Sequence, residues 1–253
     1  MVLTIHHLGI SQSERILFLC EELSIDYKIV YHTRAPIGAP QSLKDVPGNE
    51  TGKAPFLEDP EAGITLQESG AICEYILAKN SAGQLGSQQQ DKRLFKTFGE
   101  EGYSDYLYWF HWSNGTFQAL SSRFTYFEIG QIPADNLAYQ LSMAGLQALL
   151  KQLNDRLEKN KWLAGDDFTV ADIMTVWGLT SKRYFGPLVS YAAFPNILRY
   201  LKDIGERPAY QKAMEKGDPE MRLLLGAEAP EKTLIQDGGV ASEVWKKRGR
   251  SSI

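Results

Sequence analysis

The chain has 253 residues, a composition ordinary for a globular protein and a formal net charge of −4. This small negative charge gives no reason to expect nucleic acid or an anionic membrane as a partner. The two cysteines, Cys20 and Cys73, form no Cys-x-x-Cys motif, which argues against a disulfide scaffold and a dithiol redox enzyme. No basic region followed by an apolar one opens the chain, and no apolar run approaches the ~18 residues of a membrane helix. We therefore expect a cytoplasmic protein.

The first part of the chain alternates short strands with two helices. The pattern predicts strands at 2–6, 26–32, 56–58 and 64–66, and helices at 11–23 and 69–79. The stretch between 33 and 51 is rich in proline and glycine and is expected to be loop. The order β-α-β, loop, β-β-α is that of an α/β thioredoxin-like domain. We place this domain at 1–80 and a polar linker, rich in Gly and Ser, at 81–90.

The sequence pattern after the linker predicts only helices. The expected second domain, 91–227, is therefore an all-α helical bundle. Leucines from Leu146 to Leu157 make one apolar stripe, and Thr169 to Asp172 forms a capping box at the start of another helix. We assign that box to stability rather than to a functional site. The C-terminal extension, 228–253, is polar apart from Trp245, and we expect a frayed terminus there.

Two short segments suggest a binding site for a small peptide. Pro55 stands at the start of a strand, where its missing N–H predicts a role in backbone shape and a cis bond. Such a turn would leave the N–H and C=O of Ala54 to pair with an extended peptide. Glu68 and Ser69 open a helix, whose N-terminus favours a carboxylate, and Glu68 could meet an ammonium group. Together these segments suit a small zwitterionic peptide.

The run TGKAPFLED…ITLQESGAICEYIL resembles the glutathione-binding half of cytosolic glutathione transferases. The similarity extends from Val2 to about Ala227 and is strongest to the serine-type bacterial and fungal enzymes, near the theta-like branch and its yeast-type members. This resemblance implies a thioredoxin-like domain followed by a helical domain, glutathione as co-substrate, no further cofactor, no metal and a homodimer.

The resemblance also assigns a role to a serine near the first helix. By itself a serine at a helix N-terminus is most simply a cap. Serine-type transferases carry a serine after the first strand, four residues before an arginine, and Ser11 and Arg15 keep that spacing. Ser11 is therefore the predicted catalytic residue, with Ser13 as the second choice. A serine hydroxyl is too weak a base to ionise a thiol, so its expected role is to donate a hydrogen bond to the thiolate.

The glutathione-binding residues follow from the same resemblance, position by position. Glu68 and Ser69 are expected to hold the γ-glutamyl amine and carboxylate. Ala54, before Pro55, is expected to pair with the cysteinyl backbone. Lys53 is a candidate partner for the glycyl carboxylate, and an exposed lysine near a turn is an equally good reading of it.

Aromatic side chains crowd the first helix of the second domain, from Tyr103 to Trp112, and continue beyond it. They lie all round the helix, so one buried face cannot hold them all. We expect some of them to line a pocket for a small hydrophobic electrophile, since pockets favour domain interfaces. The candidates are Tyr106, Trp109, Trp112 and Phe117.

The sequence thus predicts a glutathione transferase that activates the glutathione thiol as a thiolate and adds it to a hydrophobic electrophile, in detoxification or secondary metabolism. Two alternatives stay open. One is a specialised glutathione-dependent biosynthetic tailoring enzyme or isomerase. The other is a non-catalytic protein of the same fold that binds glutathione or a protein partner.

Overall fold

The computed structural model describes residues 2–86 and 92–238, and no helix within these ranges is long and apolar enough to cross a membrane. The chain divides into two units. Met1–Arg93 and Arg207–Arg222 belong to the first, and Leu94–Glu206 and Leu223–Gln236 form the second. The expected linker and C-terminal extension fall partly outside the described residues, at 87–91 and at 239–253, which includes Trp245.

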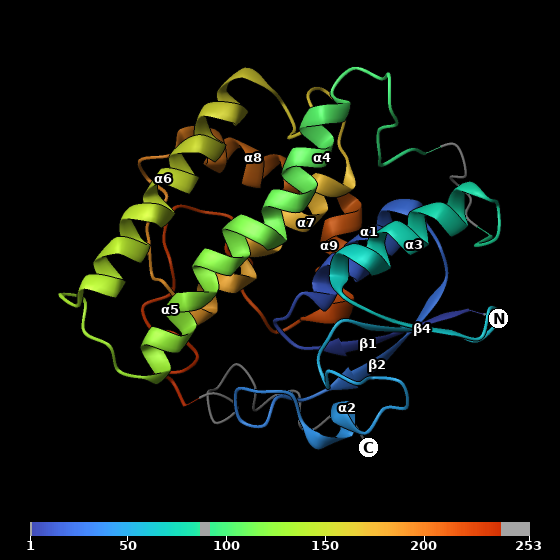
Figure 1. Ribbon diagram of the computed structural model, residues 1–253, viewed down its shortest axis with the longest axis horizontal. Helices are drawn as coiled ribbons and strands as arrows, with labels where there is room; N and C mark the ends of the chain where they lie inside the picture. Colours follow the sequence, from blue (N-terminus) through green and yellow to red (C-terminus); the bar gives the residue numbers. More distant parts are fainter. Residues whose placement is uncertain (1, 87–91, 239–253) are drawn as a thin grey trace. The chain divides into compact units, whose positions relative to one another are not determined.

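The first unit is built on a four-stranded sheet in the order β2-β1-β3-β4. Its strands are β1 (Leu3–Leu8), β2 (Tyr27–His32), β3 (Phe56–Asp59) and β4 (Ile64–Gln67). β1 and β2 are parallel and require a crossover, which α1 (Ser13–Leu23) supplies, whereas β3 and β4 form an antiparallel hairpin. After a short α2 (Gln41–Lys44) and the hairpin, α3 (Ser69–Ser81) lies beside α1 (Figure 1). The predicted thioredoxin-like fold is confirmed.

A helix from far along the chain completes this unit. α9 (Pro208–Gly217) packs against α1, and all the residues of α1 are buried. Charge pairs reinforce the contact: Glu22, 2 % exposed, accepts hydrogen bonds from Arg207 (2.6 Å) and Lys92 (2.6 Å). These hydrogen bonds hold the pKa of the Glu22 carboxyl below its usual range, although burial by itself would raise it. The sequence predicts α9 as part of the helical domain, whereas in the structure α9 packs on α1.

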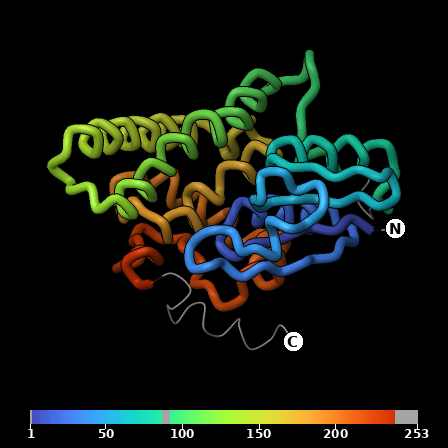
Figure 2. Tube along the Cα trace, turned by 60° about the horizontal axis from the view of Figure 1, so that its bottom comes forward, coloured from blue at the N-terminus to red at the C-terminus, as the bar shows by residue number. Residues whose placement is uncertain are grey.

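The second unit consists of helices, as predicted. Figure 1 shows α4, a π-helical turn and α5 as one continuous rod, and Figure 2 shows α6 returning alongside α5. Fully buried α7 begins at the predicted capping box: Ala171 N–H donates to the Thr169 hydroxyl, and Thr169 N–H donates to Asp172 Oδ2 at 2.9 Å. The elements are α4 (Tyr103–Trp112), η1 (Ser113–Gln118), α5 (Ala119–Ile129), α6 (Leu137–Lys159), α7 (Val170–Leu179), η2 (Ser181–Phe185) and α8 (Pro195–Gly205).

Residues 223–236 also belong to this unit. Arg183 donates hydrogen bonds to the carbonyl oxygens of Gly226 (3.0 Å) and Ala227 (2.7 Å). Further on, Leu234 is buried and its N–H donates to the carbonyl oxygen of Tyr184 at 2.8 Å. The expected frayed terminus therefore does not apply at Thr233 and Leu234, which are buried, with the Leu234 N–H bonded to η2.

Candidate active site

Ser11 lies in the turn between β1 and α1, and this turn is fixed from two sides. Arg34 donates hydrogen bonds to the carbonyl oxygens of Gly9 (2.8 Å) and Ile10 (2.7 Å). From the other side, the Ile10 N–H donates to Asp218 Oδ1 at 3.1 Å. Ile10 has a φ of 50°, in the left-handed region that a β-branched residue rarely adopts. The turn thus holds a strained backbone conformation directly before the serine.

The two candidate serines lie next to each other at the start of α1. Their hydroxyl oxygens are 2.7 Å apart, and the Ser13 N–H donates to Ser11 Oγ at 3.2 Å. Ser13 is fully buried, whereas Ser11 keeps 6 % of its surface exposed. Ser11 therefore has the outer position of the pair. The choice between them as the residue that contacts the thiol stays a prediction.

The Ala54–Pro55 peptide bond is cis, as the sequence predicts. Asn49 fixes the loop that leads to it, since its buried side chain donates hydrogen bonds to the carbonyl oxygens of Leu43 (3.0 Å) and Lys53 (3.1 Å). Pro55 is buried, Ala54 is half-buried and Lys53 is exposed. Asn49 cannot be identified from the sequence, because a single asparagine in a loop gives no sign of which carbonyl groups its side chain will contact.

Glu68 has a φ of 68° and its side chain is exposed. A positive φ is uncommon for a residue other than glycine, and such strained residues cluster at active sites and ligand clamps. Its carbonyl oxygen accepts the Ile72 N–H at 2.9 Å, so Glu68 joins β4 to the first turn of α3. The pairing of Phe56 with Gln67 places Pro55 and Glu68 at the same end of the β3–β4 hairpin. The two predicted peptide-binding segments are therefore neighbours.

A network of buried Ser69 and Arg15 with half-buried Gln12 links the α3 N-terminus to the serine turn. The Ser69 hydroxyl donates to Gln12 Oε1 at 3.1 Å and accepts from Arg15 Nη1 at 3.0 Å, and Arg15 Nη1 also donates to Gln12 Oε1 at 2.9 Å. Arg15 is 1 % exposed, and burial lowers the pKa of its guanidinium to about 10. The side chain is still cationic at pH 7. It therefore adds a positive charge at the N-terminus of α3, where the helix dipole already favours an anion.

Arg15 and Gln12 also belong to the site. The sequence pointed to Arg15 only through its spacing from Ser11, and it gave no sign of a role for Gln12. A signal was present for Arg15, because it lies within the apolar pattern of the first helix and a buried arginine requires partners. The partner itself, 54 positions further along the chain, could not be read from that pattern.

The four aromatic candidates are all buried in the structure. Tyr106, Trp109, Trp112 and Phe117 are between 2 and 7 % exposed, and α4, which carries the first three, packs against α7. The rings of Trp112 and Phe117 are stacked at a centroid distance of 5.0 Å. Their predicted role in binding a hydrophobic substrate stays a prediction.

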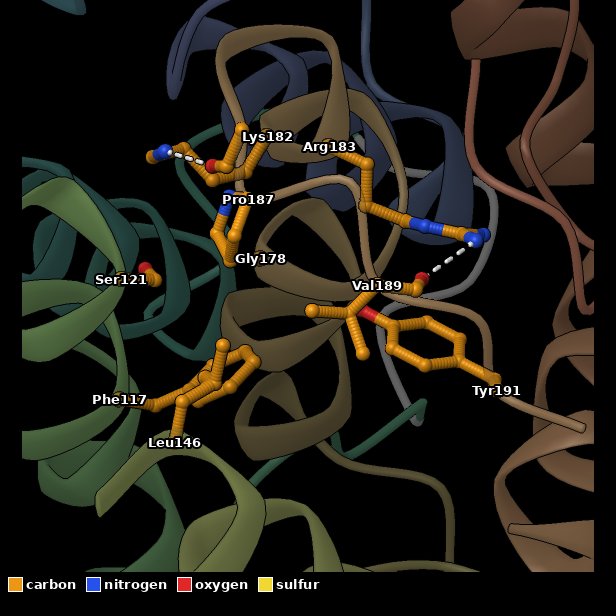
Figure 3. A pocket seen from close by; sticks show the side chains of 10 residues that line it. Phe117, Ser121, Leu146, Gly178, Lys182, Arg183, Pro187, Val189 and Tyr191 are labelled. Carbon is orange, nitrogen blue, oxygen red and sulfur yellow. Dashed lines mark hydrogen bonds between the residues drawn. The ribbon is translucent and has the colours of Figure 1, made fainter. Parts of the chain in front are cut away.

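Phe117 also lines a small cavity within the helical unit (Figure 3). The cavity measures about 20 Å³, room for about one water molecule and not for an aromatic electrophile. Buried Lys182 lies at its edge and donates hydrogen bonds to Gly186 O (2.8 Å) and Thr125 Oγ1 (3.1 Å). Burial lowers the pKa of Lys182 to about 7. The other lining residues are Ser121, Leu146, Gly178, Arg183, Gly186, Pro187, Val189 and Tyr191.

The fold is thus a thioredoxin-like unit with a cis-proline loop, a strained glutamate and a cationic helix N-terminus, followed by an all-helical unit. Comparison with known proteins gives the family. The model of the glutathione S-transferase N-terminal domain matches residues 6–84, and that of the C-terminal domain matches residues 121–208.

Among individual relatives, glutathione S-transferase 3 of Schizosaccharomyces pombe is 25 % identical over 220 residues, which cover 85 % of this chain and 88 % of the relative. Glutathione S-transferase GstB of Escherichia coli is 26 % identical over 206 residues, 79 % of this chain and 91 % of the relative. A solved glutathione S-transferase structure from Actinobacillus pleuropneumoniae is 30 % identical, with a TM-score of 0.70 and coverage of 86 % of this chain and 93 % of that one. The chain belongs to the glutathione S-transferase family, as the sequence predicts, and it is a glutathione S-transferase.

Proposed function

We propose that this enzyme holds glutathione on the first unit, ionises its thiol beside Ser11 and adds the sulfur to a hydrophobic electrophile. The observation that carries the proposal is the Gln12–Arg15–Ser69 network, which links the turn of Ser11 to the N-terminus of α3. A peptide carboxylate bound at α3 would then lie close to the serine that the thiol needs.

The site residues divide the peptide between them. The γ-glutamyl carboxylate binds at Ser69, where the α3 dipole and the charge of Arg15 favour an anion. The γ-glutamyl ammonium meets the exposed carboxylate of Glu68. The backbone of Ala54 pairs with the cysteinyl residue, and the exposed Lys53 meets the glycyl carboxylate.

The chemistry at sulfur requires an anion, because the thiolate rather than the thiol is the nucleophile. Ser11 donates a hydrogen bond from its hydroxyl group to the sulfur, and this hydrogen bond favours the charged form. The thiolate then forms a C–S bond with the electrophile while the leaving group departs with its bonding electrons. The protein supplies the environment, and glutathione supplies the nucleophile.

The hydrophobic substrate belongs to the same proposal, with Tyr106, Trp109, Trp112 and Phe117 as its candidate contacts. The density of aromatic side chains on α4 supports a substrate with apolar character. The homodimer, the cytoplasmic location and a role in detoxification or secondary metabolism rest on the family resemblance and are part of this proposal.

Replacing Ser11 by alanine tests the proposal. With glutathione and chlorodinitrobenzene as substrates, Ser11→Ala should lower kcat by roughly 10–10³-fold, the loss expected when one donor to a developing anion is removed. The KM for glutathione should change less, because the peptide contacts remain. Ser81→Ala is the matched control, since Ser81 lies at the far end of α3, where its hydroxyl donates to the carbonyl oxygen of Leu77 at 2.9 Å. A full rate in Ser11→Ala would contradict the proposal.

A further inference from the structure

A row of polar side chains in contact extends from Ser11 into the interior of the first unit. Ser11 Oγ lies 2.7 Å from Ser13 Oγ, which lies 2.9 Å from His7 Nδ1. On the far side of the ring, His7 Nε2 lies 3.3 Å from Asp218 Oδ2. His7 belongs to β1, Ser13 begins α1, and Asp218 follows the last residue of α9. Three elements therefore place two hydroxyl groups, an imidazole and a carboxylate in one row.

The row is closed to solvent except at its outer end. His7 and Ser13 are fully buried, Asp218 is 2 % exposed and Ser11 is 6 % exposed. A buried imidazole with no charge near it would stay neutral, because burial penalises the charged form. Here the Asp218 carboxylate lies beside the ring, with Oδ2 3.3 Å from Nε2. The Nε2–Oδ2 contact does not have hydrogen-bond geometry, so Asp218 acts on His7 through its charge.

Asp218 is itself held in place. Its second carboxylate oxygen, Oδ1, accepts the N–H of Ile10, in the same turn that carries Ser11. One carboxylate therefore both fixes the backbone before Ser11 and faces the inner end of the row.

The protons of the row can be arranged in two ways. When His7 Nδ1 carries no proton, it accepts the Ser13 hydroxyl, and Ser13 Oγ accepts the Ser11 hydroxyl. When Nδ1 is protonated, it donates to Ser13, and Ser13 donates to Ser11. The Ser11 proton is then directed away from the row, where it can be donated to a sulfur anion. A proton on His7 Nδ1 thus decides whether Ser11 acts as an outward donor.

We propose that the thiol proton of bound glutathione moves through Ser11 and Ser13 to His7, and that Asp218 stabilises the imidazolium formed there. The proposal rests on the proposed function, since it requires the thiol at Ser11. The S–H bond breaks, Ser11 and Ser13 each receive one proton and pass one on, and an N–H bond forms at Nδ1. Nothing is oxidised or reduced. The products are a thiolate that accepts a hydrogen bond from Ser11 and a His7 cation beside the Asp218 anion.

After the conjugate leaves, the same row can return the proton from His7 to solvent at Ser11. His7 and Asp218 are thus positioning residues, which act on the thiol through the two hydroxyl groups. Their effect should appear in the ionisation of the thiol rather than in the affinity for the peptide.

Among the described residues, the other titratable side chains around His7 are Tyr31, His32 and His6, and Arg34 interacts with the charge of Asp218 from the loop after β2. Tyr31 on β2 meets its ring edge-on at a centroid distance of 6.0 Å. His32, also on β2, has a pKa of about 4, lowered by burial and further by the charges of His6 and His7. Neighbouring His6 contacts His32 through Nδ1 at 2.9 Å, and burial lowers its pKa, although Glu58 opposes the shift. The carboxylate that these contacts place beside His7 is that of Asp218.

The test is a pH titration of the thiolate by its ultraviolet absorbance, on the enzyme saturated with glutathione. The wild-type midpoint should lie below the ~8.5 of a free thiol. His7→Gln keeps a polar side chain that cannot take up a proton, and it should raise the midpoint by about one pH unit, with about tenfold less thiolate below that midpoint. The dissociation constant for glutathione should not change when it is measured at a pH below both midpoints, where the bound thiol stays protonated in both proteins. His6→Gln, the same substitution at the next position of β1, is the matched control and should leave the midpoint unchanged.

Asp218→Asn provides a second measurement. If His7→Gln does not fold, the midpoint of Asp218→Asn alone decides whether the relay operates. Asp218→Asn keeps the shape and an acceptor for the Ile10 N–H but removes the charge, so it should also raise the midpoint. Wild-type midpoints in both folded variants would overturn the relay. If the relay is overturned in this way but Ser11→Ala still loses the thiolate signal, the proposed function remains supported. A wild-type complex without thiolate absorbance, or a normal signal in Ser11→Ala, would overturn the proposed function and the relay with it.

Discussion

Glu68 combines a strained backbone with an exposed carboxylate at the end of β4. The strain is understandable if the carboxylate must point away from the helix and toward a ligand ammonium. Because its contact is remote from sulfur, we predict an effect on binding rather than on chemistry. Glu68→Ala should raise the KM for glutathione by at least ~10-fold, the loss expected for a charge-assisted hydrogen bond of ~1.5–3 kcal/mol. The kcat at saturating glutathione should stay within a small factor of the wild-type value.

The matched control for Glu68 is Glu74→Ala, which removes an exposed carboxylate further along the same helix. Steady-state kinetics over a range of glutathione concentrations measure both variants. Equal KM values in Glu68→Ala and Glu74→Ala would show that Glu68 does not hold the ammonium.

The lowered pKa of Lys182 predicts that the stability of the helical unit depends on pH. Burial lowers its pKa from 10.5 to about 7, so between these values the unfolded chain binds a proton that the folded chain does not. The free energy of unfolding should therefore rise with pH across this window, by up to ~1.4 kcal/mol per pH unit from this group. Below about pH 7 both states bind the proton, and the contribution becomes flat.

Urea unfolding of the wild type and of Lys182→Met, at several pH values between about 7 and 9, isolates this contribution. The substitution removes the same two hydrogen bonds at every pH, so only the proton term changes with pH. We expect the wild type to gain stability relative to Lys182→Met as the pH rises. A difference that is constant with pH would contradict the assignment of a neutral, buried lysine.

At the scale of elements, the junction of α4, η1 and α5 depends on a glycine in α7. A Cβ placed on Gly178 would lie 2.7 Å from Cε1 of Phe117, whose ring stacks on Trp112. We predict that Gly178→Ala lowers the free energy of unfolding by about 1–3 kcal/mol, as overpacking of a core does. Gly115→Ala is the control, because a Cβ there meets open space. Thermal unfolding measures both, and equal melting temperatures would show that the ring moves aside at no cost.

The elements that the sequence predicts are those determined by local patterns. The β-α-β and β-β-α order, the cis bond at Ala54–Pro55 and the capping box at Thr169 all follow from residues within a few positions of each other. The π-helical turn at Ser113–Gln118 does not, because its opening Ser-Asn-Gly is equally typical of a loop that separates two helices.

At the scale of the whole molecule, the later part of the chain contributes to both units. Residues 207–222 return to the first unit, and residues 223–236 stay with the second. Asp218 reaches the turn of Ser11 across 208 positions, through the hydrogen bond to Ile10. No periodicity or spacing predicts such a contact, so Ser11 could be chosen from a motif while the row behind it could not.

The same reasoning applies to the candidate site. Ser11, Glu68 and Ser69 were found because they stand in short motifs that resemble a family. Arg34 and Asn49 support that site from loops, and their roles depend only on which carbonyl groups the fold brings to them. A sequence shows which residues can bind a ligand more readily than it shows what holds those residues in place.

The central claim is that one peptide spans the cis-proline loop, the α3 N-terminus and Ser11. A crystal structure of the enzyme with glutathione tests it most directly. We predict the γ-glutamyl group at Glu68 and Ser69, the cysteinyl backbone paired with Ala54, and the sulfur within hydrogen-bond distance of Ser11 Oγ. Glutathione bound away from Glu68 and Ser69, or with its sulfur remote from Ser11, would contradict the account.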